Sequence, residues 1–147
     1  MTESKTATKL KGARHQARAW LVQLLYQKQI ADADIEALLA EARERDQFDD
    51  IDTEFFEVVL SEVLADTATL DALVADYSDI KAEQLDPIER SVLWLSLYEL
   101  KYRHDVPVKV VINEAIELTK EFGGEDGHKF VNAVLDQAAS QLRPNKS

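Results

Sequence analysis

The segment "LDPIERSVLWLSLYEL" (residues 85–100) constrains the fold of this chain most strongly. Asp86 can cap a helix, Pro87 suits the first helical position, and Glu89 stands three residues after the cap, which is the spacing of a capping box. Over residues 88–100, eight of thirteen residues are Ile, Val, Leu, Trp or Tyr. A helix that is apolar on nearly every side has to be surrounded by other elements. The segment is therefore predicted to lie in the middle of a helical bundle.

Apolar residues recur with a helical period along the rest of the chain. Ala17, Leu21, Leu24 and Leu25 fall at i, i+4, i+7 and i+8 and predict a helix from residue 13 to about residue 29. Further stripes predict helices over residues 35–45, 53–77 (continuous or interrupted), 108–122 and 130–142. No segment shows the alternation of a strand, and the chain has only four Gly and three Pro. We therefore predict an all-α fold with six or seven helices in one compact domain.

Two local signals predict where helices begin or end. Asp52 is a natural N-cap for the helix that starts near Thr53. Gly123 and Gly124 follow the stripe over residues 108–122 and are predicted to end that helix with a positive φ.

Charge is distributed unevenly along a chain whose formal net charge is -11. Residues 1–20 hold five Lys or Arg and one Glu, whereas residues 28–90 hold 19 acids and five bases. A basic N-terminus on an acidic body indicates an anionic partner at one end and a cationic partner for the body. The absence of cysteine, of an apolar run long enough to span a membrane and of a signal peptide favours a cytoplasmic protein without membrane contact.

The cations near the N-terminus share one helix face if the first helix starts a turn before residue 13. Lys11, Arg14, His15 and Arg18 then stand at i, i+3, i+4 and i+7. A solvated helix face is the simplest interpretation of such a cluster. Two observations favour a track for nucleic-acid phosphates: no acid lies between Glu3 and Asp32, and the rest of the chain is acidic.

Motifs for catalysis or for cofactor binding are missing from the sequence. Glu125 and His128 form a single E-x-x-H pair, but a carboxylate di-iron bundle needs a second copy and two further Glu residues. There is no H-E-x-x-H, no glycine-rich phosphate loop and no G-x-S-x-G. We therefore expect no enzyme, no metal site and no cofactor.

Two aromatic residues could stack on an unpaired base. Phe130 follows Lys129 at the start of a helix, and Tyr77 stands at the end of another. Phe130 also begins an inward apolar stripe, so core packing is the competing interpretation.

Several segments resemble the NusB family of bacterial transcription antitermination factors. They are "ARHQARAWLVQLLYQ", "PIERSVLWLSLYEL", "DVPVKVVINEAIELTKEFGGEDGHKFVNAVLDQAA" and the ending "RPNK", so that the similarity covers nearly the whole chain from about Lys11. The resemblance implies two small helical bundles in residues 13–147, preceded by a flexible basic arm over residues 1–12. It also implies a non-enzymatic factor that binds boxA, a single-stranded element of ribosomal RNA leader transcripts, together with the ribosomal protein NusE. The complex joins RNA polymerase with other Nus factors.

Functional residues follow from the same resemblance, position by position. The family's arginine-rich motif falls on Arg14, His15, Gln16 and Arg18, with His15 and Gln16 at positions where denser motifs carry arginine. Other RNA-facing positions match Tyr77, Asp126, Lys129 and Phe130, and Lys11 assists from the arm. The surface that faces NusE matches Tyr26 and Glu89.

Two functional hypotheses follow. The first is an RNA-binding antitermination factor in which cations hold phosphates and Phe130 or Tyr77 stacks on a base. The second is a protein-only scaffold whose acidic surface docks a basic partner while the N-terminal stripe is merely solvated. A metal-dependent enzyme using Glu125 and His128 is a distant third.

Overall fold

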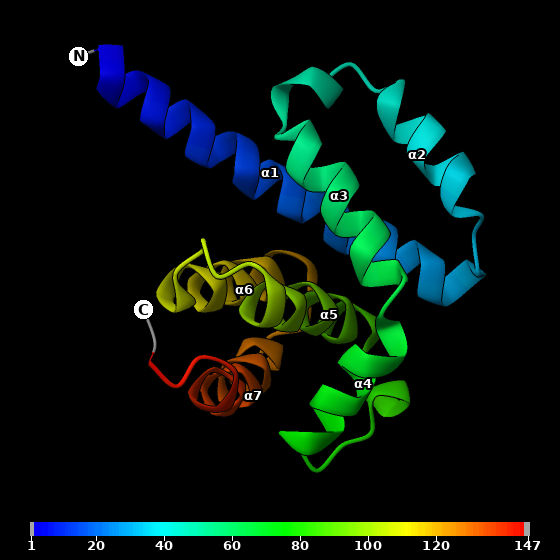
Figure 1. The fold of residues 1–147 in the computed structure, drawn as a ribbon. Helices are drawn as coiled ribbons and strands as arrows, with labels where there is room; N and C mark the ends of the chain where they lie inside the picture. The colour runs from blue at the N-terminus through cyan, green and yellow to red at the C-terminus, as the bar shows by residue number, and fades with distance from the viewer. Residues whose placement is uncertain (1, 146–147) are drawn as a thin grey trace. The chain divides into compact units, whose positions relative to one another are not determined.

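The computed structural model describes the backbone of residues 2–145 and the side chains of residues 12–145. Within this range the chain forms seven α-helices and two short 3-10 helices and no strand (Figure 1). It divides into two compact units, Met1–Glu62 (unit 1) and Val63–Ser147 (unit 2). The all-α class, the number of helices and the presence of two small helical units are as predicted.

Unit 1 is organised around aromatic contacts between α1 and α3. Its elements are α1 (Thr2–Ala31), α2 (Ile35–Arg43), η1 (Phe48–Asp50) and most of α3 (Thr53–Leu64). Trp20 on α1 packs edge-on against Phe56 on α3, with ring centroids 6.1 Å apart. Phe48 of η1 lies 6.3 Å from both rings. Such edge and tilted ring pairs stabilise the fold by more than the apolar area they bury. They therefore hold η1 and α3 against α1.

The first helix is longer than the sequence predicted. The apolar stripe indicated a start at residue 13, whereas α1 begins at Thr2. The side chains of residues 1–11, and with them the predicted RNA contact of Lys11, lie outside the described residues. The flexibility of the arm over residues 1–12 stays a prediction.

Unit 2 is built around α5. Its elements are α4 (Thr67–Asp76), η2 (Ala82–Gln84), α5 (Pro87–Tyr102), α6 (Val108–Phe122) and α7 (Gly127–Leu142). The central helix α5 contacts α4, α6 and α7, and every residue from 91 to 100 is buried. The prediction that this helix lies in the middle of a bundle is therefore confirmed. The long stripe over residues 53–77 is interrupted, since α3 ends at Leu64 and α4 begins at Thr67.

Two predicted helix caps form as expected. Asp86 Oδ2 accepts hydrogen bonds from the backbone amides of Ile88 and Glu89, at 3.0 and 3.2 Å. Asp52 Oδ1 accepts one from the amide of Phe55, at 3.2 Å. Each cap supplies an acceptor to amides that the first turn of a helix leaves without a partner.

Two other predictions about helix ends are wrong. Gly123 has φ -103°, so α6 ends without a left-handed residue. Glycine is needed there for space instead, because a Cβ would lie 2.8 Å from the Thr119 carbonyl oxygen. The capping box of α5 is incomplete, since Glu89 lies against Gly127, where a Cβ would be 2.7 Å from Glu89 Oε2.

No helix in the described part of the chain is both long enough and apolar enough to cross a membrane.

Candidate nucleic-acid interface

Arg14 is held by α3 and still reaches the surface. Its Nε donates to Asp52 Oδ2 at 2.8 Å, and the two side chains are 33% and 28% exposed. The centre of the guanidinium lies 4.2 Å from the centroid of the Phe55 ring, a distance at which the cation is attracted to the ring face. The absence of acids between Glu3 and Asp32 therefore does not leave Arg14 without an acidic partner. The partner lies 38 residues along the chain, where the local spacing of charges cannot show it.

Arg18, one turn further along α1, is not on an exposed face. Only 3% of the residue is exposed, and its guanidinium lies 5.1 Å from the same Phe55 ring. Arg18 therefore does not fit the simple interpretation of a solvated helix face, and its predicted RNA contact stays a prediction. Every residue from Ala17 to Val22 is buried, so α1 is enclosed on all sides at this level and Arg18 is buried with its neighbours. In this structure Arg18 packs inside unit 1 beside Phe55.

His15 and Gln16 lie between these two arginines in the sequence of α1. His15 is half-buried and takes part in an interaction, and Gln16 is exposed. Both offer hydrogen-bonding groups to a base edge or to a phosphate. At 100° per residue, His15 lies about 100° around the helix from Arg14 and Gln16 about 160° from it on the other side, so the three side chains do not share one edge of α1.

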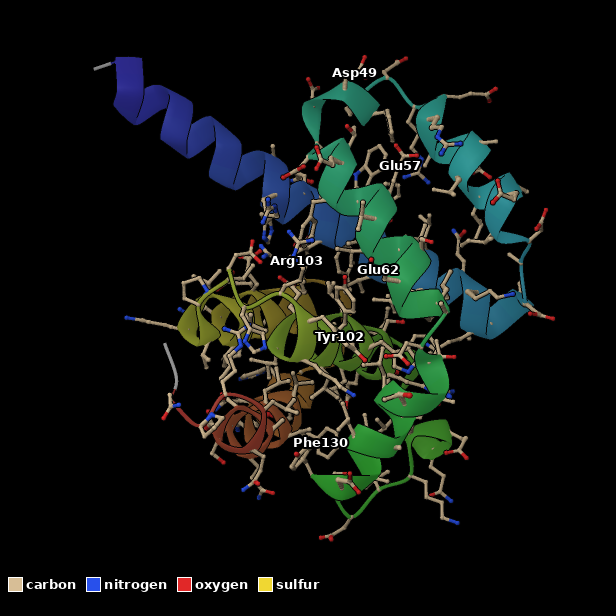
Figure 2. All side chains as sticks on the ribbon, viewed as in Figure 1. Asp49, Glu57, Glu62, Tyr102, Arg103 and Phe130 are labelled. Carbon is tan, nitrogen blue, oxygen red and sulfur yellow. The ribbon has the colours of Figure 1, made fainter. Side chains whose placement is uncertain are left out.

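The N-terminus of α7 brings three predicted site residues together. Asp126 precedes the helix, and Lys129 and Phe130 lie in its first turn. Lys129 Nζ is 3.3 Å from Asp126 Oδ1 with both side chains more than 70% exposed, so water screens this pair strongly. Phe130 is half-buried on α7, which makes it part core residue and part surface (Figure 2).

Glu89 links this turn to α5. Its carboxylate lies against Gly127, the first residue of α7. Burial raises the pKa of Glu89, and the charge of Asp86 adds to the effect. The predicted partner-facing residue Glu89 is thus in contact with the turn that carries the predicted RNA-facing residues Asp126, Lys129 and Phe130.

The remaining predicted positions belong to other helices. Tyr77 is the half-buried C-cap residue of α4 in unit 2. Tyr26 lies on α1 in unit 1 and is 36% exposed, one turn before the exposed Ile30. The two exposed apolar residues give this end of α1 a surface suited to contact with another protein.

Acidic side chains cover other parts of unit 1. Asp49 on η1 is exposed, and Glu57 on α3 is half-buried and pairs with Arg43 of α2 (Figure 2). Residues 28–62 contain 12 acids and three bases. This surface repels a phosphate backbone and attracts a basic partner.

The E-x-x-H pair does not assemble a metal site in the part of the chain that the structure describes. Glu125 is exposed, and His128 is half-buried with an enclosed Nδ1 that has no hydrogen-bond partner. No group of three or more His, Cys, Asp or Glu residues that could hold a metal ion occurs among residues 12–145.

Sequence reasoning missed two residues that shape this interface. Asp52 was identified only as a helix cap and Phe55 only fell within the apolar stripe over residues 53–77, yet both contact Arg14. Neither long-range contact has a signature in the local sequence.

Comparison with known proteins agrees with the fold. The model of the NusB family matches residues 15–140. The transcription antitermination proteins NusB of Escherichia coli (strain K12 / DH10B) and of Shigella boydii serotype 18 are each 47% identical to this chain over 134 residues, covering 91% of this chain and 96% of theirs. The structure of NusB from T. maritima matches with a TM-score of 0.77 at 28% identity, covering 90% of this chain and 94% of that one.

The family match spans both units, and its relatives align along almost their full length. Sequence and fold agree over the same residues. This chain belongs to the NusB family of transcription antitermination proteins.

Proposed function

We propose that this antitermination factor binds boxA single-stranded RNA in ribosomal RNA leader transcripts. It does so as a heterodimer with the ribosomal protein NusE and joins RNA polymerase together with other Nus factors. The observation that carries the RNA proposal is the concentration of cations in the first 20 residues of a chain with net charge -11. Counterions released from RNA phosphates favour binding at such a place.

Different side chains have different roles in the proposed complex. Arg14 and Lys129 contact phosphates, and Lys11 assists from the start of α1. His15, Gln16 and Asp126 offer hydrogen-bonding groups to base edges, and Phe130 or Tyr77 stacks on or encloses a base. A direct phosphate contact by Arg18 would require its buried guanidinium to become exposed, so we assign Arg18 to the support of Phe55.

NusE is the proposed partner of the acidic body. Tyr26 with the neighbouring Ile30 on α1 and Glu89 on α5 are its proposed contacts. A basic ribosomal protein is attracted by the field of the acidic residues, which speeds the encounter more than it adds affinity.

The test is a titration of boxA RNA and of a scrambled RNA of equal length with this chain, alone and with NusE, at two or more salt concentrations. With Arg14, Lys129 and the assisting Lys11 as phosphate contacts to a single strand, we expect log affinity to fall against log salt with a slope of about -2. We expect boxA to bind more tightly than the scrambled RNA. Absent or sequence-independent binding in both arms would favour the protein-only scaffold.

Lys129→Ala identifies one of the phosphate contacts in this titration. Loss of one contact to a single strand should reduce the magnitude of the slope by about 0.7. The matched control is Lys28→Ala. It also removes one lysine charge, but from the last turn of α1, where Lys28 pairs with Asp32.

A further inference from the structure

We propose that Asp52 is a positioning residue for RNA binding, which holds the guanidinium of Arg14 in the orientation that meets a phosphate. The inference rests on the proposed function, because it concerns one of the cations assigned to the RNA backbone. It adds an acidic residue to an interface that would otherwise be described by its cations and aromatic rings.

Asp52 is anchored from both sides. Its backbone amide donates to the Ala13 carbonyl oxygen on α1 at 3.0 Å. Its Oδ1 caps α3 by accepting from the Phe55 amide, at 3.2 Å. The carboxylate therefore has a fixed place between α1 and α3, and its second oxygen, Oδ2, presents a stationary acceptor to Arg14 Nε.

Arg14 is thereby constrained at two points. Asp52 holds the Nε edge, and the Phe55 ring lies 4.2 Å from the centre of the guanidinium. With one edge bonded and one face against a ring, the planar guanidinium has few orientations left relative to α1. The two terminal Nη groups remain as a fork, the geometry with which arginine binds two phosphate oxygens at once.

Two effects of Asp52 on RNA affinity oppose each other. Its negative charge partly cancels that of Arg14 and repels phosphates, so Coulomb interactions alone predict tighter RNA binding when the charge is removed. Loss of the anchor predicts weaker RNA binding instead. An arginine that is not held in the free protein has to give up its rotational freedom when RNA binds, and this costs free energy. The sign of the change in affinity therefore decides between them.

The experiment is Asp52→Asn, measured by the boxA titration with NusE present. Asn caps helices about as well as Asp, so α3 keeps its start. With its single oxygen on the Phe55 amide, Asn turns an NH₂ group toward Arg14 Nε and cannot hold it. We expect RNA affinity to fall about three- to tenfold, the cost of immobilising one long side chain.

The matched control is Glu57→Gln, which neutralises another acid on α3. Glu57 pairs with Arg43 rather than with Arg14, so the variant removes the same charge and leaves the bond between Asp52 and Arg14 in place. We expect its RNA affinity to be unchanged or slightly increased. Unfolding in urea shows that each variant is folded before it is titrated.

A double-mutant cycle with Arg14→Ala completes the test. If Asp52 acts through Arg14, then Asp52→Asn causes no further loss in the Arg14→Ala background. Unchanged or tighter RNA binding by Asp52→Asn alone would overturn the proposal, as would an equal loss in both backgrounds. An Arg14→Ala variant that binds like the wild type would overturn it while leaving RNA binding itself intact. Failure of the wild-type chain with NusE to prefer boxA would overturn the proposed function as well.

Discussion

Arg14 and Arg18 have the same side chain one helical turn apart, but their surroundings differ. Arg14 is one-third exposed, whereas Arg18 is 3% exposed and lies beside Phe55. We expect Arg14→Ala to weaken RNA binding while changing the free energy of unfolding by less than about 1 kcal/mol, because a partly exposed ion pair contributes little. We expect Arg18→Ala to lower that free energy by about 1–3 kcal/mol, because a buried side chain and its contacts are lost.

Urea denaturation of the two single variants measures the difference in stability, and the boxA titration measures binding. Equal losses of stability in both variants would contradict the contrast between a surface arginine and a structural one.

The pKa of Glu89 gives the stability of the protein a pH dependence. Burial raises this pKa, and the charge of Asp86 raises it further. A carboxyl group with a raised pKa in the folded state contributes stability that is fully present below its unfolded pKa of about 4.3 and is lost as pH rises through the folded pKa. We therefore expect Glu89→Gln to be more stable than the wild type at pH 7 and to lose this advantage near pH 4. Urea denaturation across this range measures it, and a constant difference at all pH values would exclude Glu89 as the cause.

At the scale of the helix, α5 depends on a residue that follows α7. Arg143 is 6% exposed and donates to the carbonyl oxygens of Glu99, Leu100 and Arg103 at 2.8–2.9 Å. A fourth donation, at 2.6 Å, reaches Val106 in the connection to α6. The last carbonyls of a helix lack partners within it, and a guanidinium that satisfies several of them at once caps the helix from outside.

We expect Arg143→Ala to lower the free energy of unfolding by about 2–4 kcal/mol, because several buried carbonyl groups lose a charged donor together. Arg143→Lys should recover only part of the loss, since an ammonium lacks the planar fork. Urea denaturation measures both. Arg43→Ala, which removes an arginine from a partly exposed pair with Glu57, is the control and should cost less than about 1 kcal/mol.

At the scale of the whole molecule, net charge governs how fast the proposed partner arrives. The chain carries -11, and Asp49 and Asp50 are among its exposed acids. We expect the association rate with NusE to fall about tenfold or more from low to high salt, while the dissociation rate changes little. The double variant Asp49→Asn/Asp50→Asn should also lower the association rate, because it removes two of the negative charges that attract NusE. Stopped-flow kinetics measures both rates, and an association rate that ignores salt would exclude electrostatic steering.

Membership of the NusB family makes this chain a transcription antitermination factor. As a transcription antitermination factor it is not an enzyme, in agreement with the absence of catalytic motifs from the sequence. The RNA element and the NusE contacts are proposals that the experiments above address.

The sequence by itself determined the features that depend on neighbouring residues. The start of α5 at Asp86–Pro87, its buried interior and the cap at Asp52 all follow from interactions within one or two helical turns. The all-α class follows from the apolar period, and family membership from residues that can be read directly. Local periodicity and capping act over a few residues, so they are visible without coordinates.

Only the tertiary structure decided what the charged side chains do. Arg18 is buried, Arg14 is anchored by Asp52, Glu89 lies against Gly127, and Arg143 caps a helix more than 40 residues away in sequence. A charged group takes its role from whichever backbone or side chain the fold brings within about 3 Å, and sequence spacing carries no record of such contacts. The pattern of charges therefore indicated where cations gather on this chain, and the packing of α3 against α1 selected which of them faces solvent.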